Sequence, residues 1–190
     1  MAAVKKKKFW EVKIPIIGGS VDLLAYALED LNNKTIKLDL TRQLRGKSIE
    51  VVFKIKIEDN IAIATPIKLT LLPFFIRRML RKNISYVEDS FSTECEDASI
   101  RIKPFLITRK KVSRVIRKAL RNEEKNWLQD YLKNKSYENI FSEIIYSKIQ
   151  KSLSLHLKKI YPLALCEIRI LNIEKLREQE KLEVKIEKIK

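Results

Sequence analysis

A period-two hydrophobic pattern over residues 48–57 constrains the fold of this chain more than any other feature. A second strand-like segment, residues 61–70, follows it, with Asp59-Asn60 between them. Successive side chains of a strand point to opposite faces, so a period of two predicts strands with one buried face. Asp-Asn is tight-turn chemistry. We therefore expect an antiparallel hairpin whose first strand buries Ile49, Val51, Phe53, Ile55 and Ile57.

Other segments also have the composition and period of strands. A first strand is predicted from Phe9 to Ile17, ended by Pro15 and the Gly18-Gly19 turn. The remaining predicted strands are Thr35–Leu40, a second hairpin of Ile84–Thr93 and Ser99–Ile107 around the polar residues Glu94–Asp97, and Leu163–Asn172.

Four segments have helical spacing instead. Ser20 is placed to cap a helix over Val21–Leu31, and Pro73 opens a short helix with Phe75 on its apolar face. A longer helix follows Thr108 with an apolar stripe that we expect to include Val112, Val115, Ile116, Ala119, Leu120, Trp127, Leu128, Tyr131 and Leu132. Helix continues from Ser136 to Ile160, with a break near Ser147, because Pro162 forbids its extension.

This order of elements favours an α+β fold, because antiparallel connections dominate and the helices follow groups of strands. We expect an antiparallel β-barrel of about six or seven strands flanked by helices. Residues 1–8 are interpreted as a basic N-terminal tail, residues 9–172 as a single barrel-plus-helices domain, and residues 173–190 as a charged C-terminal appendage.

The charge balance indicates a polyanionic partner. The chain has 40 Lys and Arg against 24 Asp and Glu, a formal net charge of +16. Such a surplus repels itself unless a polyanion neutralises it and releases counterions, so nucleic acid is the leading candidate. A heat-adapted surface raises Lys and Glu together and does not explain the sign.

Compartment and membrane association follow from other residues. Cys95 and Cys166 lie far apart without CxxC spacing, so we expect neither a disulfide framework nor a zinc site and place the chain in a reducing compartment. Charged residues interrupt the N-terminal segment too early for a signal-peptide core. Lys68 and Pro73 split the longest apolar run, so no membrane helix is expected.

Basic residues gather where helices are predicted. From Ser99 to Asn122 the chain carries nine basic residues and no acidic one, whereas a solvated helix face usually mixes signs. Trp10 beside the lysine tail is a candidate to stack on a base, with anchoring of the first strand in the core as the alternative. The predicted RNA-binding residues are Lys5, Lys6, Lys7, Lys8, Trp10, Arg77, Arg78, Arg81, Lys82, Arg109, Lys110, Lys111, Arg114, Arg117, Lys118 and Arg121.

Catalytic chemistry is weakly supported, and no enzyme activity, cofactor or metal is expected. His156, the single histidine, lies between two leucines of a helix and is interpreted as a half-buried or surface imidazole. Glu94, Glu96 and Asp97 suit a solvated turn better than a two-metal nuclease cluster. Gly18-Gly19 fits neither nucleotide-binding glycine pattern.

Several stretches together resemble one family. Residues 8–15 (KFWEVKIP), 114–120 (RVIRKAL), 158–163 (KKIYPL) and 167–169 (EIR) are similar to the opening strand, the basic helix and the C-terminal segment of the archaeal and eukaryotic small-subunit ribosomal protein family S-three-A-e, also called eukaryotic-type S-one. The likeness covers roughly Lys7 to Leu171. Residues 20–33 diverge from the family pattern, and the long lysine-rich N-terminal extension of eukaryotic members is absent.

The resemblance implies a cytoplasmic structural constituent of the small ribosomal subunit. It implies binding to the 3′ region of the small-subunit ribosomal RNA on the platform near the messenger exit, with neighbouring ribosomal proteins and messenger RNA as further partners. The charge pattern independently points to the same class of partner. Two rival functions share the charge: a free RNA-binding regulator or RNA chaperone, and an RNA-processing enzyme, which needs a clustered site that these residues do not supply.

Overall fold

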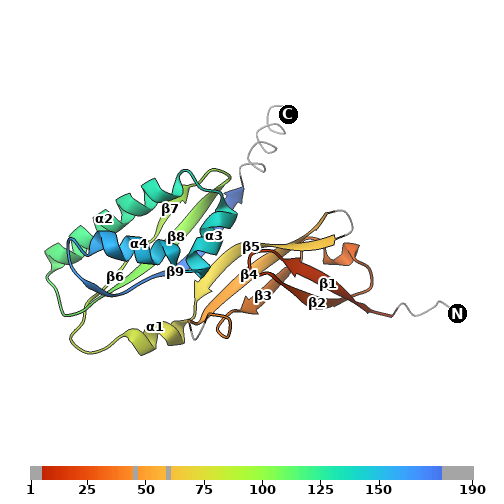
Figure 1. Cartoon of the computed structure of the whole chain (residues 1–190), viewed down its shortest axis with the longest axis horizontal. Coiled ribbons are helices and arrows are strands. Elements are labelled where there is room, and N and C mark those ends of the chain that lie inside the picture. The colour runs from red at the N-terminus through yellow and green to blue at the C-terminus, as the bar shows by residue number, and fades with distance from the viewer. Residues whose placement is uncertain (1–5, 45–46, 59–60, 177–190) are drawn as a thin grey trace, which may run out of the picture.

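A branched nine-stranded sheet and four α-helices form the framework in the computed structural model, which describes residues 6–44, 47–58 and 61–176 (Figure 1). Along the chain the elements are β1 (Lys8–Ile14), β2 (Gly19–Ala25), the 3-10 turn η1 (Glu29–Leu31), β3 (Thr35–Asp39), β4 (Ile49–Glu58), β5 (Ile61–Leu71), α1 (Pro73–Met79), β6 (Tyr86–Glu88), β7 (Phe91–Glu94), β8 (Ala98–Thr108), α2 (Arg114–Leu132), α3 (Tyr137–Ile145), α4 (Lys148–Leu157) and β9 (Leu163–Leu176).

The N-terminal half is built on the predicted hairpin of β4 and β5, which is confirmed as antiparallel. Val51, Phe53 and Ile55 of β4 are completely buried, as the alternation requires, while Ile57 is half-buried. β3 pairs with the outer edge of β4, and the hairpin of β1 and β2 joins through a short parallel pairing of β1 with β5. The spatial order of this half is β3-β4-β5-β1-β2.

An irregularity in β5 explains how the strand carries a proline. Val52 pairs with Lys68 and Phe53 with Pro66, so Ile67 is an extra residue in the ladder. Proline has no N–H to donate and is tolerated in a sheet at such a bulge. The extra residue also shifts the buried side chains of β5 from even-numbered to odd-numbered positions. The buried positions are Ala62, Ala64 and Pro66 before the bulge, and Leu69 and Leu71 after it.

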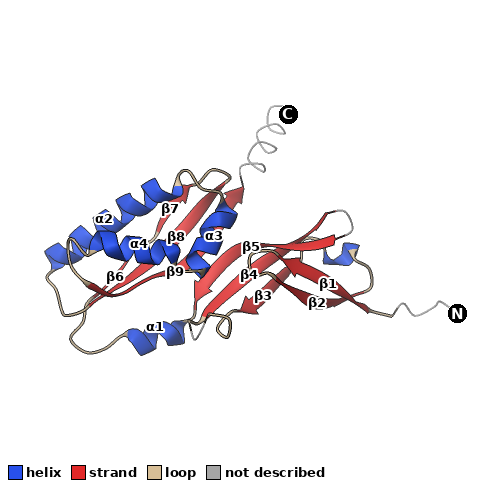
Figure 2. Cartoon of the chain, in the orientation of Figure 1, coloured by secondary structure: helices blue, strands red, loops and turns tan. Residues whose placement is uncertain are grey.

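The C-terminal half is a smaller sheet covered by helices. β8 pairs with β9 along one edge, and its other edge is shared by β7 and β6. Helices α2, α3 and α4 lie over this sheet (Figure 2). The core between them includes Phe105, Leu106, Leu120, Phe141 and Leu153, each at most 1% exposed.

The two halves meet at a short junction, and the sheet does not close into a barrel. β5 and β9 pair only through Lys68–Asn172, Leu69–Leu171 and Thr70–Ile170. Within the described residues β2 and β3 pair with β1 and β4 alone, so both remain edge strands. The α+β class is confirmed, but the predicted barrel is not. Long strands that divide an edge between two shorter ones branch the sheet instead of closing it.

The helix predicted over Val21–Leu31 is wrong. β2 pairs with β1 in continuous register, Val21 opposite Val12 and Leu23 opposite Trp10, behind a turn in which Gly18 has φ +70°. Only Glu29–Leu31 forms a 3-10 turn. The segment satisfies both periods, and the edge of the preceding strand decides between them, because a tight turn brings the two together.

Several boundaries differ from the predictions. The predicted strand Ile84–Thr93 is divided into β6 and β7, and β9 continues four residues beyond Asn172. The break near Ser147 is confirmed, because Ser147 separates α3 from α4 with a left-handed φ of 59°. The Asp59-Asn60 turn and residues 177–190 lie outside the described residues. The division into tail, domain and appendage stays a prediction.

Candidate nucleic-acid interface

Helix α1 separates its apolar and basic side chains, although it is shorter than predicted. Pro73 occupies its first turn, where a missing N–H costs nothing, and Phe75 and Ile76 are buried against the core. Arg77 and Arg78 are exposed on the other side. Met79 ends the helix, so two further predicted residues lie in the loop beyond it and are exposed: Arg81 and Lys82.

A set of hydrogen bonds, which we call the clasp, ties this loop to the segment before α2. Ser85 N–H donates to Thr108 Oγ1 (3.1 Å), and Thr108 N–H donates to the Ser85 carbonyl (2.9 Å). The Ser85 hydroxyl accepts from Val112 N–H at 3.2 Å. Thr108 is 0% exposed, while Ser85 and Val112 are half-buried, so the clasp is partly shielded from water. The clasp brings together two basic segments whose joined residues are 23 and 27 positions apart.

Helix α2 continues the basic surface from the clasp. Ser113 caps it by accepting a hydrogen bond from Ile116 N–H at 3.4 Å. Its first turn has no acidic residue, although carboxylates are the side chains that favour a helix N-terminus. Arg114 and Lys118, one turn apart, are exposed. Val115, predicted in the apolar stripe, is 77% exposed and lies outside it.

We call the exposed basic residues around the clasp the clasp surface: Arg81, Lys82, Arg109, Lys110, Lys111, Arg114 and Lys118. None of them has a salt bridge in the described part of the chain. The cations with a salt bridge include Lys47, Arg101, Lys133, Lys135, His156 if protonated, and Arg169. The clasp surface is therefore positive without internal neutralisation, as a phosphate-binding surface must be.

Arg117 and Arg121 of α2 are placed differently from the clasp surface. Arg117 is half-buried, with its Nε buried and without a hydrogen-bond acceptor among the described residues. Arg121 is exposed and lies close enough to Glu124 to act on its charge. Both were predicted to bind RNA, and both stay predictions.

Two lysines that the sequence analysis used only for the family resemblance lie in the same half of the molecule. Lys158 and Lys159 are exposed and follow α4 directly. They precede β9, whose first residue, Leu163, pairs with Thr108 of the clasp. Their position shortly before Pro162, which ends a helix, could have predicted that both lysines lie in an exposed turn between a helix and a strand.

Strand β1, with which the N-terminal basic residues are associated, lies toward the opposite end of the long axis from α2 (Figure 1). Lys6, Lys7 and Lys8 are exposed, and the Lys7 ammonium lies 5.4 Å from the centre of the Tyr26 ring. Trp10 is half-buried and packs against the core, as the alternative role of anchoring the first strand requires. Its role in RNA binding stays a prediction, and Lys5 lies outside the described residues.

Below the basic surface, α2 buries one carboxyl group. Glu124 is 0% exposed, and neither of its oxygens has a hydrogen-bond partner among the described residues. Burial, together with the nearby charge of Asp89, raises the pKa of Glu124 to about 8, and Arg121 opposes the shift. The group is therefore mainly protonated at neutral pH.

Comparisons with known proteins agree with the resemblance. The family model described as the Ribosomal S3Ae family matches residues 2–176. The chain belongs to the Ribosomal S3Ae family. Small ribosomal subunit protein eS1 of Nanoarchaeum equitans is 28% identical over 178 residues, which are 89% of this chain and 90% of the relative. The protein of the same name from Methanothermobacter thermautotrophicus is 24% identical over 173 residues, covering 86% and 88%.

Membership of the S3Ae family supports a structural role in the small ribosomal subunit, in translation.

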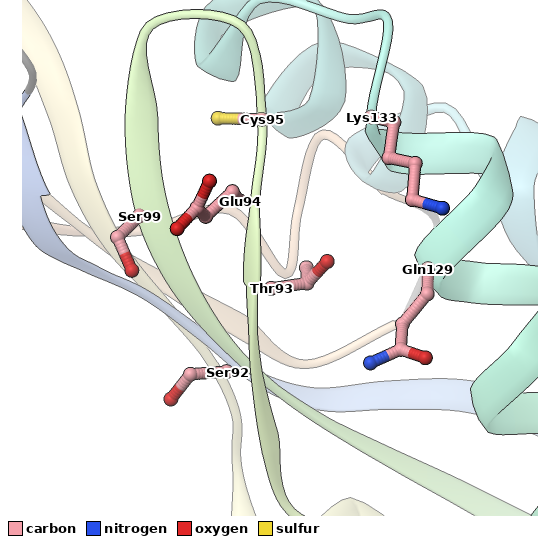
Figure 3. A pocket seen from close by; sticks show the side chains of 7 residues that line it. All are labelled: Ser92, Thr93, Glu94, Cys95, Ser99, Gln129 and Lys133. Atoms are coloured by element: carbon pink, nitrogen blue, oxygen red, sulfur yellow. The ribbon is translucent and has the colours of Figure 1, made fainter.

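The polar cavity in Figure 3, about 630 Å3, lies between β7 and the end of α2. Thr93 faces Gln129 and Lys133 across it, while Ser92 and Glu94 lie on the other side of β7. Because its lining is divided between two faces of a strand, its polar groups do not converge on one point.

The described residues contain neither a group of side chains suited to a metal ion nor a helix suited to cross a membrane. Across residues 6–44, 47–58 and 61–176, no three His, Cys, Asp or Glu side chains are grouped to hold a metal ion. His156 Nε2 lies 2.7 Å from Glu123 Oε1 on the surface, as a half-buried imidazole. No helix in the described part of the chain has the length and apolar character to cross a membrane.

Proposed function

We propose that this S3Ae-family chain binds ribosomal RNA of the small subunit through the clasp surface as a structural constituent. The observation that carries the proposal is the clasp. It joins the segment that follows Arg81 and Lys82 to the segment that contains Arg109–Lys111, through partly buried hydrogen bonds. Cations held on rigid elements lose little conformational entropy when they bind phosphate. The Arg side chains add two-point hydrogen bonding to phosphate oxygens.

The location within the ribosome rests on the family resemblance. The proposal places the chain on the platform near the messenger exit, in contact with the 3′ region of the RNA, with neighbouring ribosomal proteins and with messenger RNA. It places the protein in the cytoplasm as part of the ribosome. No enzyme activity and no cofactor are assigned to it.

Sedimentation of a native extract tests this function. The expected result is recovery of the chain in stoichiometric amount with the small subunit after a moderate salt wash. A chain that remains in a soluble pool, exchanging between naked RNAs, would instead act as a free regulator or RNA chaperone. Metal-dependent cleavage of RNA by the purified protein would replace the structural function with an enzymatic one.

A further inference from the structure

A second basic site lies where the two halves of the sheet separate. Between its pairing with β1 at Ala62–Ile63 and with β9 at Lys68–Thr70, the edge of β5 has no strand partner among the described residues. A cavity of about 330 Å3 lies at this gap. Its lining comes from both halves: Asn33, Lys54 and Lys56 of β4, Thr65–Ile67 of β5, Tyr137 of α3, and Ile173–Leu176 of β9.

Lys54 and Lys56 give the cavity its charge. They are two residues apart in β4 and so lie on the same face, opposite the buried Phe53 and Ile55. Both are half-buried, and neither has a salt bridge with a carboxylate in the described part of the chain. Half-burial covers the alkyl stem of a lysine, and an ammonium group without a carboxylate partner remains available to bind an anion.

The one acidic residue in the lining is engaged elsewhere. Glu174 accepts from Arg101 Nε at 2.6 Å, so its charge is already balanced. Lys175, the next residue, adds a third ammonium to the lining. Tyr137 also lines the cavity, and its hydroxyl donates to Glu138 at 3.2 Å.

We infer that this cavity binds a phosphate of an RNA strand, with Lys54 and Lys56 as its ligands. The inference rests on the proposed function for the identity of the polyanion and adds a site distinct from the clasp surface. A volume of about 330 Å3 lies at the small end of the range for ligand pockets, which suits one phosphodiester with part of its nucleotide. The Tyr137 ring offers an apolar surface to the sugar or base.

RNA is favoured over an acidic protein segment by the charge of the whole chain. With a net charge of +16, the surface around the cavity attracts a polyanion of high charge density. Each bound phosphate releases condensed counterions, a gain that a single carboxylate does not give.

The test compares two full-length variants with the unaltered protein in binding to small-subunit ribosomal RNA over a salt series. One is Lys54→Gln/Lys56→Gln. The control is Lys13→Gln/Lys37→Gln, which removes two exposed strand lysines outside the cavity lining. We expect the first to reduce affinity about tenfold or more near 0.1 M salt and to make the slope of log affinity against log salt shallower by one to two, roughly one per phosphate contact. The control should change affinity by less than about twofold.

Amine-reactive footprinting provides a second readout. Lys54 and Lys56 should react with an acylating reagent in the free protein and be protected in the RNA complex, while Lys13 and Lys37 stay reactive. Equal reactivity in both states would overturn the inference. So would a Lys54→Gln/Lys56→Gln protein that binds naked RNA normally but dissociates from assembled subunits, because that result assigns the cavity to a neighbouring protein.

The same experiment separates this inference from the proposed function. If the unaltered protein binds RNA and Arg114→Glu/Lys118→Glu weakens it, the clasp surface stands whatever the cavity variant does. If neither pair of substitutions affects binding, both assignments fail. Thermal unfolding of each free variant checks that a loss of affinity is not a loss of fold.

Discussion

The clasp surface and the N-terminal hairpin are both rich in cations, but they hold them differently. Around the clasp, two segments that carry basic residues are joined by partly buried hydrogen bonds, and none of these basic residues has a salt bridge among the described residues. On the hairpin, Lys13 shares a face of β1 with Glu11, which lies opposite Asp22 of β2. Acidic and basic groups lie side by side there.

A count of basic residues therefore does not locate a nucleic-acid interface. Phosphate binding needs cations that are held close together without acidic neighbours, so that the field adds up and little entropy is lost. The clasp surface meets both conditions, whereas the hairpin presents lysines near the end of the chain and mixes their charge with carboxylates. We expect the clasp surface to supply most of the affinity for RNA.

Charge reversal on α2 should have the largest effect. In Arg114→Glu/Lys118→Glu, two phosphate contacts are lost and two repulsive charges are added, so affinity for small-subunit RNA near 0.1 M salt should fall about 100-fold. Stable incorporation into the subunit should be lost while circular dichroism stays native. Arg121 is left unchanged because it acts on Glu124. Lys148→Glu/Lys151→Glu, on the exposed face of α4, is the matched control. Unaltered binding by the first variant would remove the phosphate-binding role from this face.

Glu124→Gln should change the pH dependence of stability. The pKa of Glu124 is about 8 in the folded chain and 4.5 for an unperturbed glutamate, so the folded chain holds one more proton between these pH values. The free energy of unfolding therefore falls as pH rises from about 4.5 to 8. Above pH 8 the glutamine variant should be more stable than the unaltered chain by about 5 kcal/mol, and near pH 4 the two should be similar.

Denaturant unfolding at pH 4, 7 and 9 measures this difference. Glu29→Gln, at an exposed position of the 3-10 turn, is the control and should leave the profile unchanged. Equal stabilities of the Glu124 variant and the unaltered chain at pH 9 would show that the carboxyl group has a partner or reaches water. In that case the stability of α2 would not depend on pH through Glu124.

Thr108→Val should weaken the clasp with a smaller effect. The substitution keeps the shape of the side chain but removes the acceptor for Ser85 N–H and the donor of the Thr108 hydroxyl. Losing such buried hydrogen bonds costs about 1–2 kcal/mol of unfolding free energy. RNA affinity should fall by a few-fold, and the loss should be absent in Thr93→Val, a buried threonine outside the clasp. A loss of stability without any loss of affinity would mean that the two basic segments act independently.

Removal of residues 2–7 should have the smallest effect. The deletion takes away Lys5, Lys6 and Lys7, and the slope of log affinity against log salt should become shallower by about one, because each contact contributes ~0.7 to ~0.9 and ordering a chain end costs entropy. The full-length slope should be roughly −3.5 to −7, for about five to eight phosphate contacts. A slope near zero after the deletion would reverse the comparison and assign binding to the N-terminal lysines.

Local periodicity was enough to predict the elements that pair with their neighbours in sequence. β4 follows from its period-two pattern, β5 follows from the turn residues that separate it from β4, and the break at Ser147 follows from the sequence pattern around it. The segment Val21–Leu31 fits both a strand and a helix, and only its pairing with β1 decides, which no single segment reveals. The barrel was wrong because closure depends on which distant edges meet, and the pattern of one strand does not contain that information.

The candidate site could be predicted as a list of residues but not as an arrangement. The acid-free run from Ser99 to Asn122 predicted the basic character of Arg109–Lys111 and of the first turns of α2, where Arg114 and Lys118 are exposed. It did not show that Ser85 would bring Arg81 and Lys82 beside them. Nor did it find Lys54 and Lys56, because alternation presents them as ordinary residues on the wet face of a strand, and their partial burial comes from elements far along the chain.

The three-residue junction between β5 and β9 also sets an order in time. Lys68–Thr70 finds its partner only when Ile170–Asn172 exists, whereas β1 to β5 pair among themselves and β6 and β7 pair with β8. Pairings of such large sequence separation form late, because the intervening chain must be ordered first. We therefore expect a chain that is still being synthesised to form two separate sheets, which join once Ile170–Asn172 has been added.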